Sequence, residues 1–143
     1  MGHLYETDIV AWAEQQADFL RRGEWSKLDL FNLAEEIEDV AKSERRELRS
    51  RLAVLLSHLL KWQFQPALRS KSWRATIAIQ RRVIARELKK MPSLQRLLVD
   101  EEWLQDAWLD AVSLAIGETD LHDFPDYPIW TVSEFLDPAF LPD

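Results

Sequence analysis

The sequence predicts an all-α fold: a single helical domain at residues 1–143, built as a bundle of about four main helices with an aromatic, Pro-rich C-terminal tail packed on it. Apolar residues recur at helical spacing along most of the chain, and residues 29–65 contain neither Gly nor Pro. The chain is 47% hydrophobic and has seven Trp, which is enough apolar material for one core. It has no Cys, which excludes disulfides and thiolate metal sites.

The first helix is predicted at residues 7–22. The Thr7 hydroxyl can accept a hydrogen bond from free amides at its N-terminus, and Gly23 can adopt the left-handed conformation that ends many helices. Trp25, in the connector that follows, is expected to pack against the bundle. The apolar face of this helix combines Ile9, Ala13, Ala17 and Leu20, flanked by Trp12 and Phe19.

A long central helix is predicted at residues 29–65, and we expect the other helices to pack around it. Because 18 residues make about five turns, residues at that separation lie on the same side of a helix. From Leu52 to Phe64 apolar residues occur on nearly every side, which places this half at the centre of the bundle. The polar segment around Ser43 leaves open whether the helix breaks there. The apolar residues matched in this way are Leu30 with Leu48, Ala34 with Leu52, Ile37 with Leu55, and Ala41 with Leu59.

Two further helices are predicted at residues 72–91 and 93–116. The first of them can begin near Ser72, and Pro92 stops it because proline lacks a backbone N–H and clashes with the preceding turn. The second has room for a bend around residues 100–102.

The C-terminal tail, residues 118–143, contains four Pro and loses the helical period. It carries several large aromatic side chains, which gain by burial, so we expect an ordered segment wrapped over the bundle rather than a disordered peptide. Thr131 and Glu134 have the spacing of a capping box, which predicts a short helix at residues 132–136.

The net charge of −7 hides a division along the chain. Residues 42–90 hold 14 of the 18 Lys and Arg and 3 of the 25 Asp and Glu, a net charge of +11, and the remainder carries −18. A basic segment can mark an anionic partner, nucleic acid above all. Alternatively, the acidic ends fold back over the basic middle and neutralise it, which we favour for a chain that is acidic overall.

Basic and aromatic side chains concentrate at residues 61–74, around the predicted helix break at Pro66. Arg side chains bind phosphate and carboxylate through paired donors, and a helix beginning at Ser72 would add free backbone amides. Trp62 and Trp73 fall on inner stripes, which favours a core position over stacking on bases. The candidate anion-binding residues are Arg45, Lys61, Arg69, Lys71, Arg74 and Arg81.

A polar edge runs along the central helix beside its apolar stripe, formed by Glu44, Glu47, Arg51 and His58. Such edges perturb pKa values, so His58 could act as a base oriented by a carboxylate. Glu47 and Arg51 also match an ordinary i, i+4 ion pair, and the sequence has no HExxH, Walker A, GxSxG or dinucleotide fingerprint. Glu44, Glu47 and His58 are therefore the catalytic candidates, but we favour a protein without enzymatic activity and expect no metal and no cofactor.

Four stretches follow one another in order along the chain: LYETDIVAWAEQQ, LAEEIEDVAKSERRELRSRLAVLLSHLLKWQFQP, SKSWRATI and FLDPAFLP. They closely resemble the bacterial proteins grouped as domain-of-unknown-function family 29, and the resemblance covers nearly the whole chain. It implies a small, soluble, largely α-helical protein, and it assigns no activity, cofactor, partner or catalytic residue.

These observations favour a cytoplasmic binding or interaction module without catalytic activity. The N-terminus lacks the basic flank and apolar run of a signal peptide, and no run approaches the roughly 18 apolar residues that indicate a membrane span. The partner is a second copy of the chain, another protein, or nucleic acid or another anionic ligand bound by residues 42–90. A hydrolase or metal-dependent enzyme using Glu44, Glu47 and His58 is the remaining alternative. If an acidic end met the basic middle of a second copy, the association would loosen in salt.

Overall fold

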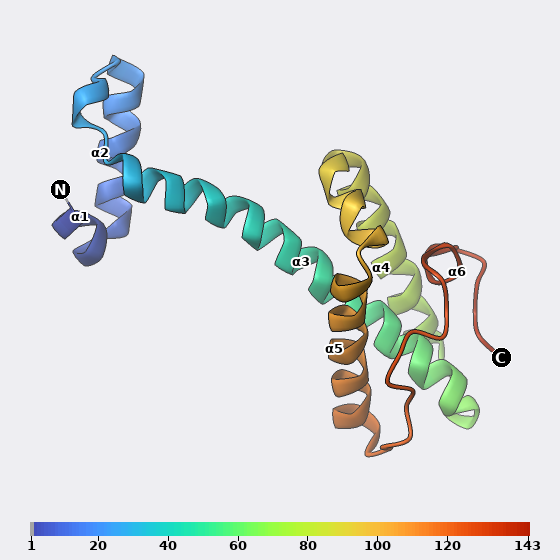
Figure 1. The fold of residues 1–143 in the computed structure, drawn as a ribbon. Coiled ribbons are helices and arrows are strands. Elements are labelled where there is room, and N and C mark those ends of the chain that lie inside the picture. The colour runs from blue at the N-terminus through green and yellow to red at the C-terminus, as the bar shows by residue number, and fades with distance from the viewer. Residues whose placement is uncertain (1) are drawn as a thin grey trace. The chain divides into compact units, whose positions relative to one another are not determined.

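The computed structural model describes residues 2–143, with side chains from Leu4 onward, and its regular elements are helices (Figure 1). The predicted all-α fold is therefore confirmed. None of the helices in residues 2–143 combines the length and apolarity that crossing a membrane requires. The chain divides into two compact units, Met1–Glu44 and Arg45–Asp143, which we call the N-terminal and C-terminal units. The four main helices are α2 (Ile9–Arg22), α3 (Leu30–Phe64), α4 (Lys71–Lys90) and α5 (Glu101–Thr119).

The N-terminal unit begins with a short helix, α1 (Gly2–Thr7), that the sequence analysis did not anticipate. Because Thr7 belongs to α1, it does not cap α2, and Asp8 does so instead: its carboxylate accepts a hydrogen bond from the Ala11 amide at 3.0 Å. Gly23 ends α2 with φ at 71°, the left-handed conformation that glycine adopts at no steric cost. A 3₁₀ turn, η1 (Trp25–Lys27), leads on to α3.

Polar contacts join α2 to the beginning of α3. The Trp12 indole N–H donates to the Asp29 carboxylate at 3.0 Å, and the Gln16 side-chain oxygen accepts from the Asp29 amide at 2.8 Å. The Tyr5 ring packs edge-on against Trp12, with centroids 4.8 Å apart. Trp12 and Gln16 are consequently the buried residues of α2.

The predicted inner face of α2 is wrong. Ile9 and Leu20 are exposed, whereas Trp12 and Gln16 on the neighbouring face are buried. Trp25 was expected to pack against the bundle, but its side chain is 65% exposed. Helical spacing identifies an apolar face but not the element that covers it, and here the side chains that reach Asp29 determine how α2 packs.

Helix α3 is continuous from Leu30 to Phe64, so there is no break at Ser43. Its apolar stripe has two different environments. In the N-terminal unit, Leu30 and Ile37 are each 69% exposed. In the C-terminal unit the continuation of the same stripe is fully buried, and it comprises Leu48, Leu52, Leu55 and Leu59.

Helices α4 and α5 surround this buried half of α3. Helix α4 is capped by Ser70 rather than by Ser72, because the Ser70 hydroxyl accepts from the Trp73 amide at 3.1 Å. A 3₁₀ helix, η3 (Pro92–Val99), follows α4. Asp100 then caps α5 by accepting from the Trp103 amide, which separates two elements where one bent helix was predicted.

The C-terminal tail packs on the bundle, as predicted, and Figure 1 shows it in red running back from α5 toward α4. Phe124, Trp130 and Phe135 are buried in the common core. Thr131 and Glu134 form the capping box of α6 (Val132–Leu136). Large aromatic side chains thus hold in place a segment with little regular structure.

Candidate anion-binding site

The candidate site lies at the turn between α3 and α4. Pro66 follows the last residues of α3 and begins a 3₁₀ turn, η2 (Pro66–Leu68), which reverses the chain. The turn brings the end of α3 against the first turn of α4. Between them lies a pocket of about 420 Å³, lined by Trp62, Arg69, Ser70, Lys71 and Arg74.

Two guanidinium groups lie against the Trp62 ring in this pocket. The Cζ atoms of Arg69 and Arg74 are 5.0 and 5.4 Å from the ring centroid, within the range of a cation–π contact. Arg69 Nε also donates to the Trp62 carbonyl at 2.7 Å, which satisfies an acceptor in the last turn of α3. Trp62 is itself buried. It therefore supports the two cations and does not offer a free face on which a nucleic acid base could stack.

The first turn of α4 adds backbone donors to the pocket. Ser70 uses its hydroxyl to satisfy the Trp73 amide. The amides of Lys71 and Ser72 belong to the same first turn, where a helix offers no intrahelical acceptor. Within residues 2–143, no ion pair engages Arg69, Lys71 or Arg74. Three cations and the positive end of a helix dipole thus surround one pocket, an arrangement that favours an anion.

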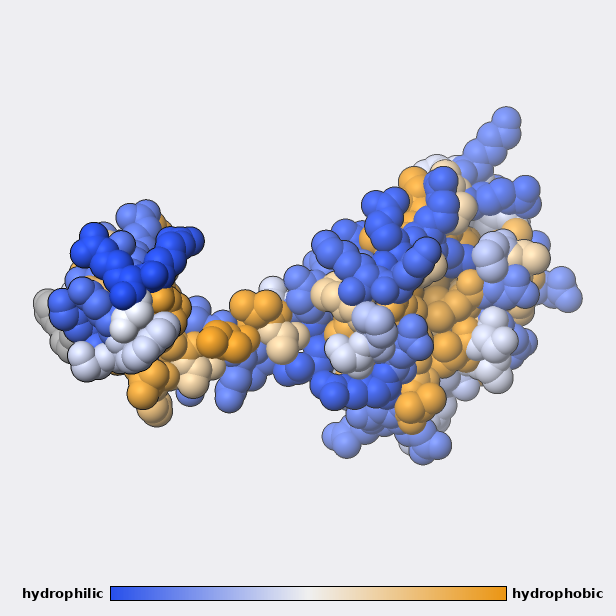
Figure 2. All heavy atoms as spheres, turned by 90° about the horizontal axis from the view of Figure 1, so that it is seen from above, coloured by the Kyte–Doolittle hydropathy of each residue, from blue (hydrophilic) through white to orange (hydrophobic). Residues whose placement is uncertain are grey.

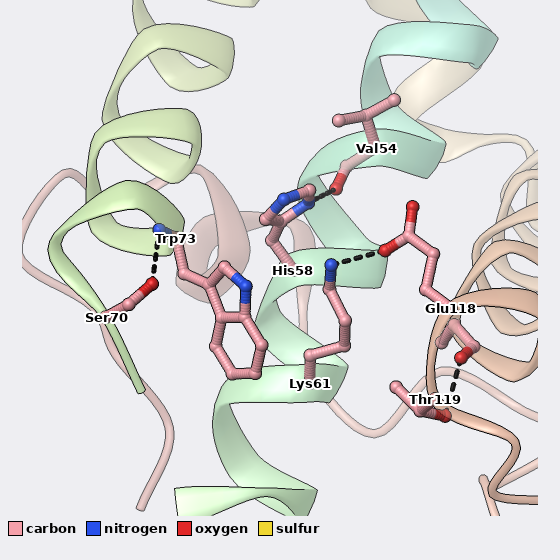
Figure 3. Close-up of polar contacts among 8 residues, drawn as sticks. Val54, His58, Lys61, Ser70, Trp73, Glu118 and Thr119 are labelled. Carbon is pink, nitrogen blue, oxygen red and sulfur yellow. Dashed lines mark hydrogen bonds and ion pairs between the residues drawn. The ribbon is translucent and has the colours of Figure 1, made fainter. Parts of the chain in front are cut away.

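Lys61 is close to this pocket in sequence but has a different environment (Figure 3). Its side chain comes from α3, is only 5% exposed, and forms an ion pair with Glu118 near the end of α5. Its ammonium also lies 5.1 Å from the centroid of the Trp73 ring. The charge of Lys61 is therefore compensated inside the molecule, which distinguishes it from the three pocket cations.

His58 lies one turn before Lys61, and its Nδ1 is 2.9 Å from the Val54 carbonyl oxygen (Figure 3). Burial lowers the pKa of His58, and the charge of Lys61 acts in the same direction, whereas the Val54 carbonyl and Glu118 act against them. A lowered pKa leaves the imidazole neutral at pH 7, so Nδ1 donates its hydrogen to the Val54 carbonyl.

The other members of the predicted polar edge of α3 make contacts that do not involve His58. Glu47 pairs with Arg51 at 2.9 Å, and Arg51 also approaches Glu87 of α4 at 3.4 Å. No hydrogen bond or ion pair within residues 2–143 joins His58 to Glu44 or to Glu47. Over the same residues, no group of three or more His, Asp or Glu is arranged to hold a metal ion.

The structure gathers only some of the predicted anion-binding residues. Arg69, Lys71 and Arg74 line one pocket. Arg45 precedes Trp62 by 17 residues, about 25 Å along the helix, and Arg81 is buried beneath the C-terminal tail. Sequence reasoning missed the role of Trp62 as a support for guanidinium groups, although its spacing from Arg69 and Arg74 across a Pro turn was visible.

The His58 environment predicts a pH dependence of stability. The pKa of His58 in the folded protein lies below its unfolded value of about 6.5. As the pH falls below that value, the unfolded state takes up a proton before the folded state does, so stability is lost; above it, both states are neutral and the contribution is constant. His58→Gln is expected to remove the part of the stability loss at acid pH that comes from this histidine. Urea midpoints between about pH 8 and pH 5 test it, and equal slopes for variant and wild type would contradict it.

The comparisons with known proteins agree with the sequence resemblance. Searches of curated proteins and of solved structures find no match. A family model described as "Domain of unknown function DUF29" matches residues 4–141, nearly the whole chain. The chain therefore belongs to the DUF29 family.

Proposed function

We propose that this protein is a binding module without catalytic activity, which captures a phosphate-bearing ligand in the pocket between α3 and α4, in the cytoplasm that the sequence predicts. The observation that carries the proposal is the set of cations left without acidic partners around one pocket. Some other cations of the C-terminal unit do have carboxylate partners: Arg49 pairs with Asp110 at 2.6 Å, Arg51 pairs with Glu47 at 2.9 Å, and Lys61 pairs with Glu118. At Arg69, Lys71 and Arg74 the positive charge faces the pocket instead.

The donors suit a phosphate group better than a single carboxylate. Arg74 presents a planar fork that binds two oxygens at once, and Lys71 adds a point charge. The amides of Lys71 and Ser72 add donors of fixed direction. A group with two negative charges and three terminal oxygens can use all of these together. Because Trp62 is buried under Arg69 and Arg74, nucleic acid would be held here by its backbone phosphates and not by its bases.

Binding of inorganic phosphate, a phosphorylated peptide and a single-stranded oligonucleotide tests the proposal. We expect saturable binding at low salt, with the ¹⁵N-labelled side-chain signals of Arg69 and Arg74 shifting in NMR titrations. Arg74→Gln is expected to weaken affinity about tenfold or more, since one charge-assisted hydrogen bond contributes about 1.5 to 3 kcal/mol. Affinity should fall steeply as salt rises if several phosphates of an oligonucleotide are contacted.

Arg86→Gln is the matched control for Arg74→Gln. Arg86 is exposed on the same helix, 12 residues further along, which is about 18 Å from Arg74. Both variants lose one positive charge, so a difference between them reports the pocket and not the net charge. The proposal fails if the wild-type protein binds none of the three probes at low salt, or if Arg86→Gln weakens binding as much as Arg74→Gln does.

A further inference from the structure

A second pocket, which we call the tail pocket, lies between α4 and the C-terminal tail. Over the face of the C-terminal unit that Figure 2 draws, apolar residues, in orange, lie exposed among hydrophilic ones, in blue. The tail pocket has a volume of about 260 Å³, below the roughly 300 to 1,000 Å³ of sites that hold a whole small molecule. Its size suits one aliphatic side chain. The residues that line it are Ala78, Arg81, Arg82, Ala85, Leu136 and Pro138.

The walls of the tail pocket are mostly apolar. Helix α4 contributes two alanine methyl groups, and Leu136 packs against the hydrophobic core. The Arg81 guanidinium donates to carbonyls of the tail, so its charge is already engaged there. Asp137, which stands in sequence between the two tail residues of the lining, adds a negative charge. An uncharged group therefore fits the tail pocket better than a phosphate does.

The tail pocket lies on the same side of α4 as the candidate anion-binding site. Each residue turns a helix by about 100°, so the α4 residues that line the two pockets fall within an arc of about 100°. Arg82 lies inside this arc, and no ion pair within residues 2–143 engages it. Glu87, the one carboxylate in the sequence of α4, points about 160° from Lys71, and it approaches Arg51 of α3 at 3.4 Å. The side of α4 that joins the two pockets is therefore positively charged and has no carboxylate of its own.

The separation of the two pockets matches the repeat of an extended peptide. The midpoint of Ala78 and Ala85 lies nine residues beyond the midpoint of Lys71 and Arg74, about 14 Å along α4. Four residues of an extended chain span about 13 Å. Because side chains alternate along such a chain, residues four apart point to the same side. A peptide that lies along α4 thus places one side chain in each pocket at once.

We propose that the ligand of this protein is a phosphorylated peptide with an aliphatic residue, such as leucine, four positions from the phosphorylated residue. The phosphate occupies the pocket between α3 and α4, so this inference rests on the proposed function, and the aliphatic side chain occupies the tail pocket. A nucleic acid strand fits less well, because its further phosphates along α4 would meet apolar walls and the charge of Asp137.

Isothermal titration calorimetry with three phosphoserine peptides tests the inference. Since either chain direction spans the same distance, leucine stands four residues after the phosphoserine in one peptide and four before it in another, and alanine fills both positions in the third. We expect one leucine peptide to bind about tenfold or more tightly than the alanine peptide, because it buries its leucine side chain. The same leucine peptide without its phosphate should bind at least about tenfold more weakly, since it loses the charge-assisted hydrogen bonds.

Ala78→Phe separates the tail pocket from the phosphate site. Ala78 is exposed, so the larger side chain fills the pocket without entering the core. We expect this variant to lose the preference for leucine and to keep the affinity for the alanine peptide. Ala41→Phe is the matched control, because it makes the same change at an exposed alanine of the N-terminal unit. In methyl NMR spectra of the wild-type protein, the Ala78 and Ala85 signals should shift with the leucine peptide and not with the alanine peptide.

The outcomes distinguish this inference from the proposed function. Equal affinities for the three phosphopeptides would overturn the inference alone, and so would binding of inorganic phosphate without binding of any phosphopeptide. A preference for leucine that Ala78→Phe leaves intact would also overturn it. So would a single-stranded oligonucleotide that binds more tightly than the leucine phosphopeptide. If neither inorganic phosphate, nor the phosphopeptides, nor the oligonucleotide binds at low salt, the inference and the proposed function fail together.

Discussion

Replacing Trp108 with Ala is expected to lower the free energy of unfolding of the C-terminal unit by about 4 kcal/mol. Trp108 lies in α5 and is fully buried. Its ring packs edge-on against Trp130 of the tail, with centroids 5.5 Å apart, and its indole N–H donates to the Pro125 carbonyl at 2.8 Å. The substitution removes the largest of the fully buried side chains and leaves that carbonyl without its donor. Urea denaturation followed by circular dichroism measures the loss.

Two further substitutions separate the contributions at this position. Trp108→Phe keeps an aromatic ring but loses the indole N–H, and we expect a loss of about 1 to 2 kcal/mol. Leu109→Ala changes the adjacent, exposed residue of α5 and should alter stability by about 0.5 kcal/mol or less. A loss below about 1 kcal/mol for Trp108→Ala would mean that the tail does not depend on the Trp108–Trp130 contact.

The helical architecture could be predicted because its signals are local. The apolar stripe of α3 follows from residues that share a helix direction, and the structure buries its second half from Leu48 onward. The packed tail follows from composition, since side chains such as Phe124 and Trp130 gain more from burial than the segment loses by being ordered. Neither inference needs to know which element lies beside which.

The exposure of the first half of α3 could not be predicted, because it depends on which distant elements cover the helix and not on local sequence. Ile37 and Leu55 occupy matching positions on one helical stripe, yet Ile37 is exposed and Leu55 is fully buried. The difference comes from elements far along the chain that cover Leu55. The same limit explains α2, where Trp12 is buried because its indole N–H reaches Asp29 across the η1 connection.

The candidate site was predictable only where its residues are neighbours in sequence. Arg69, Lys71 and Arg74 surround one turn, so their concentration was visible. Lys61 and Arg81 have the same chemistry but different environments. The carboxylate that pairs with Lys61 lies 57 residues further along the chain, and the nearest carbonyl bound by Arg81 lies 54 residues further along. No local pattern marks such long-range partners.

Arg81→Met is expected to release the C-terminal tail and to lower the free energy of unfolding by about 3 kcal/mol. The Arg81 side chain is 5% exposed and binds backbone rather than a carboxylate. Nε donates to the Phe135 carbonyl at 2.9 Å, and Nη2 donates to the Phe140 carbonyl at 2.7 Å. These carbonyls lie at the end of α6 and beyond it, where the chain itself supplies no donor. Burial lowers the pKa of Arg81, which indicates that the guanidinium has given up much of its hydration.

Hydrogen exchange and limited proteolysis of residues 131–143 distinguish tail release from general destabilisation. In Arg81→Met we expect amides in α6 to exchange faster under conditions where those in the second half of α3 stay protected. Arg81→Lys keeps the charge but cannot reach both carbonyls through one fork, so it should lie between Met and wild type. Arg82→Met removes a neighbouring, exposed guanidinium and should leave tail protection unchanged. Equal protection of the tail amides in Arg81→Met and Arg82→Met would contradict the prediction. It would mean that burial of Phe124, Trp130 and Phe135 holds the tail in place without the hydrogen bonds of Arg81.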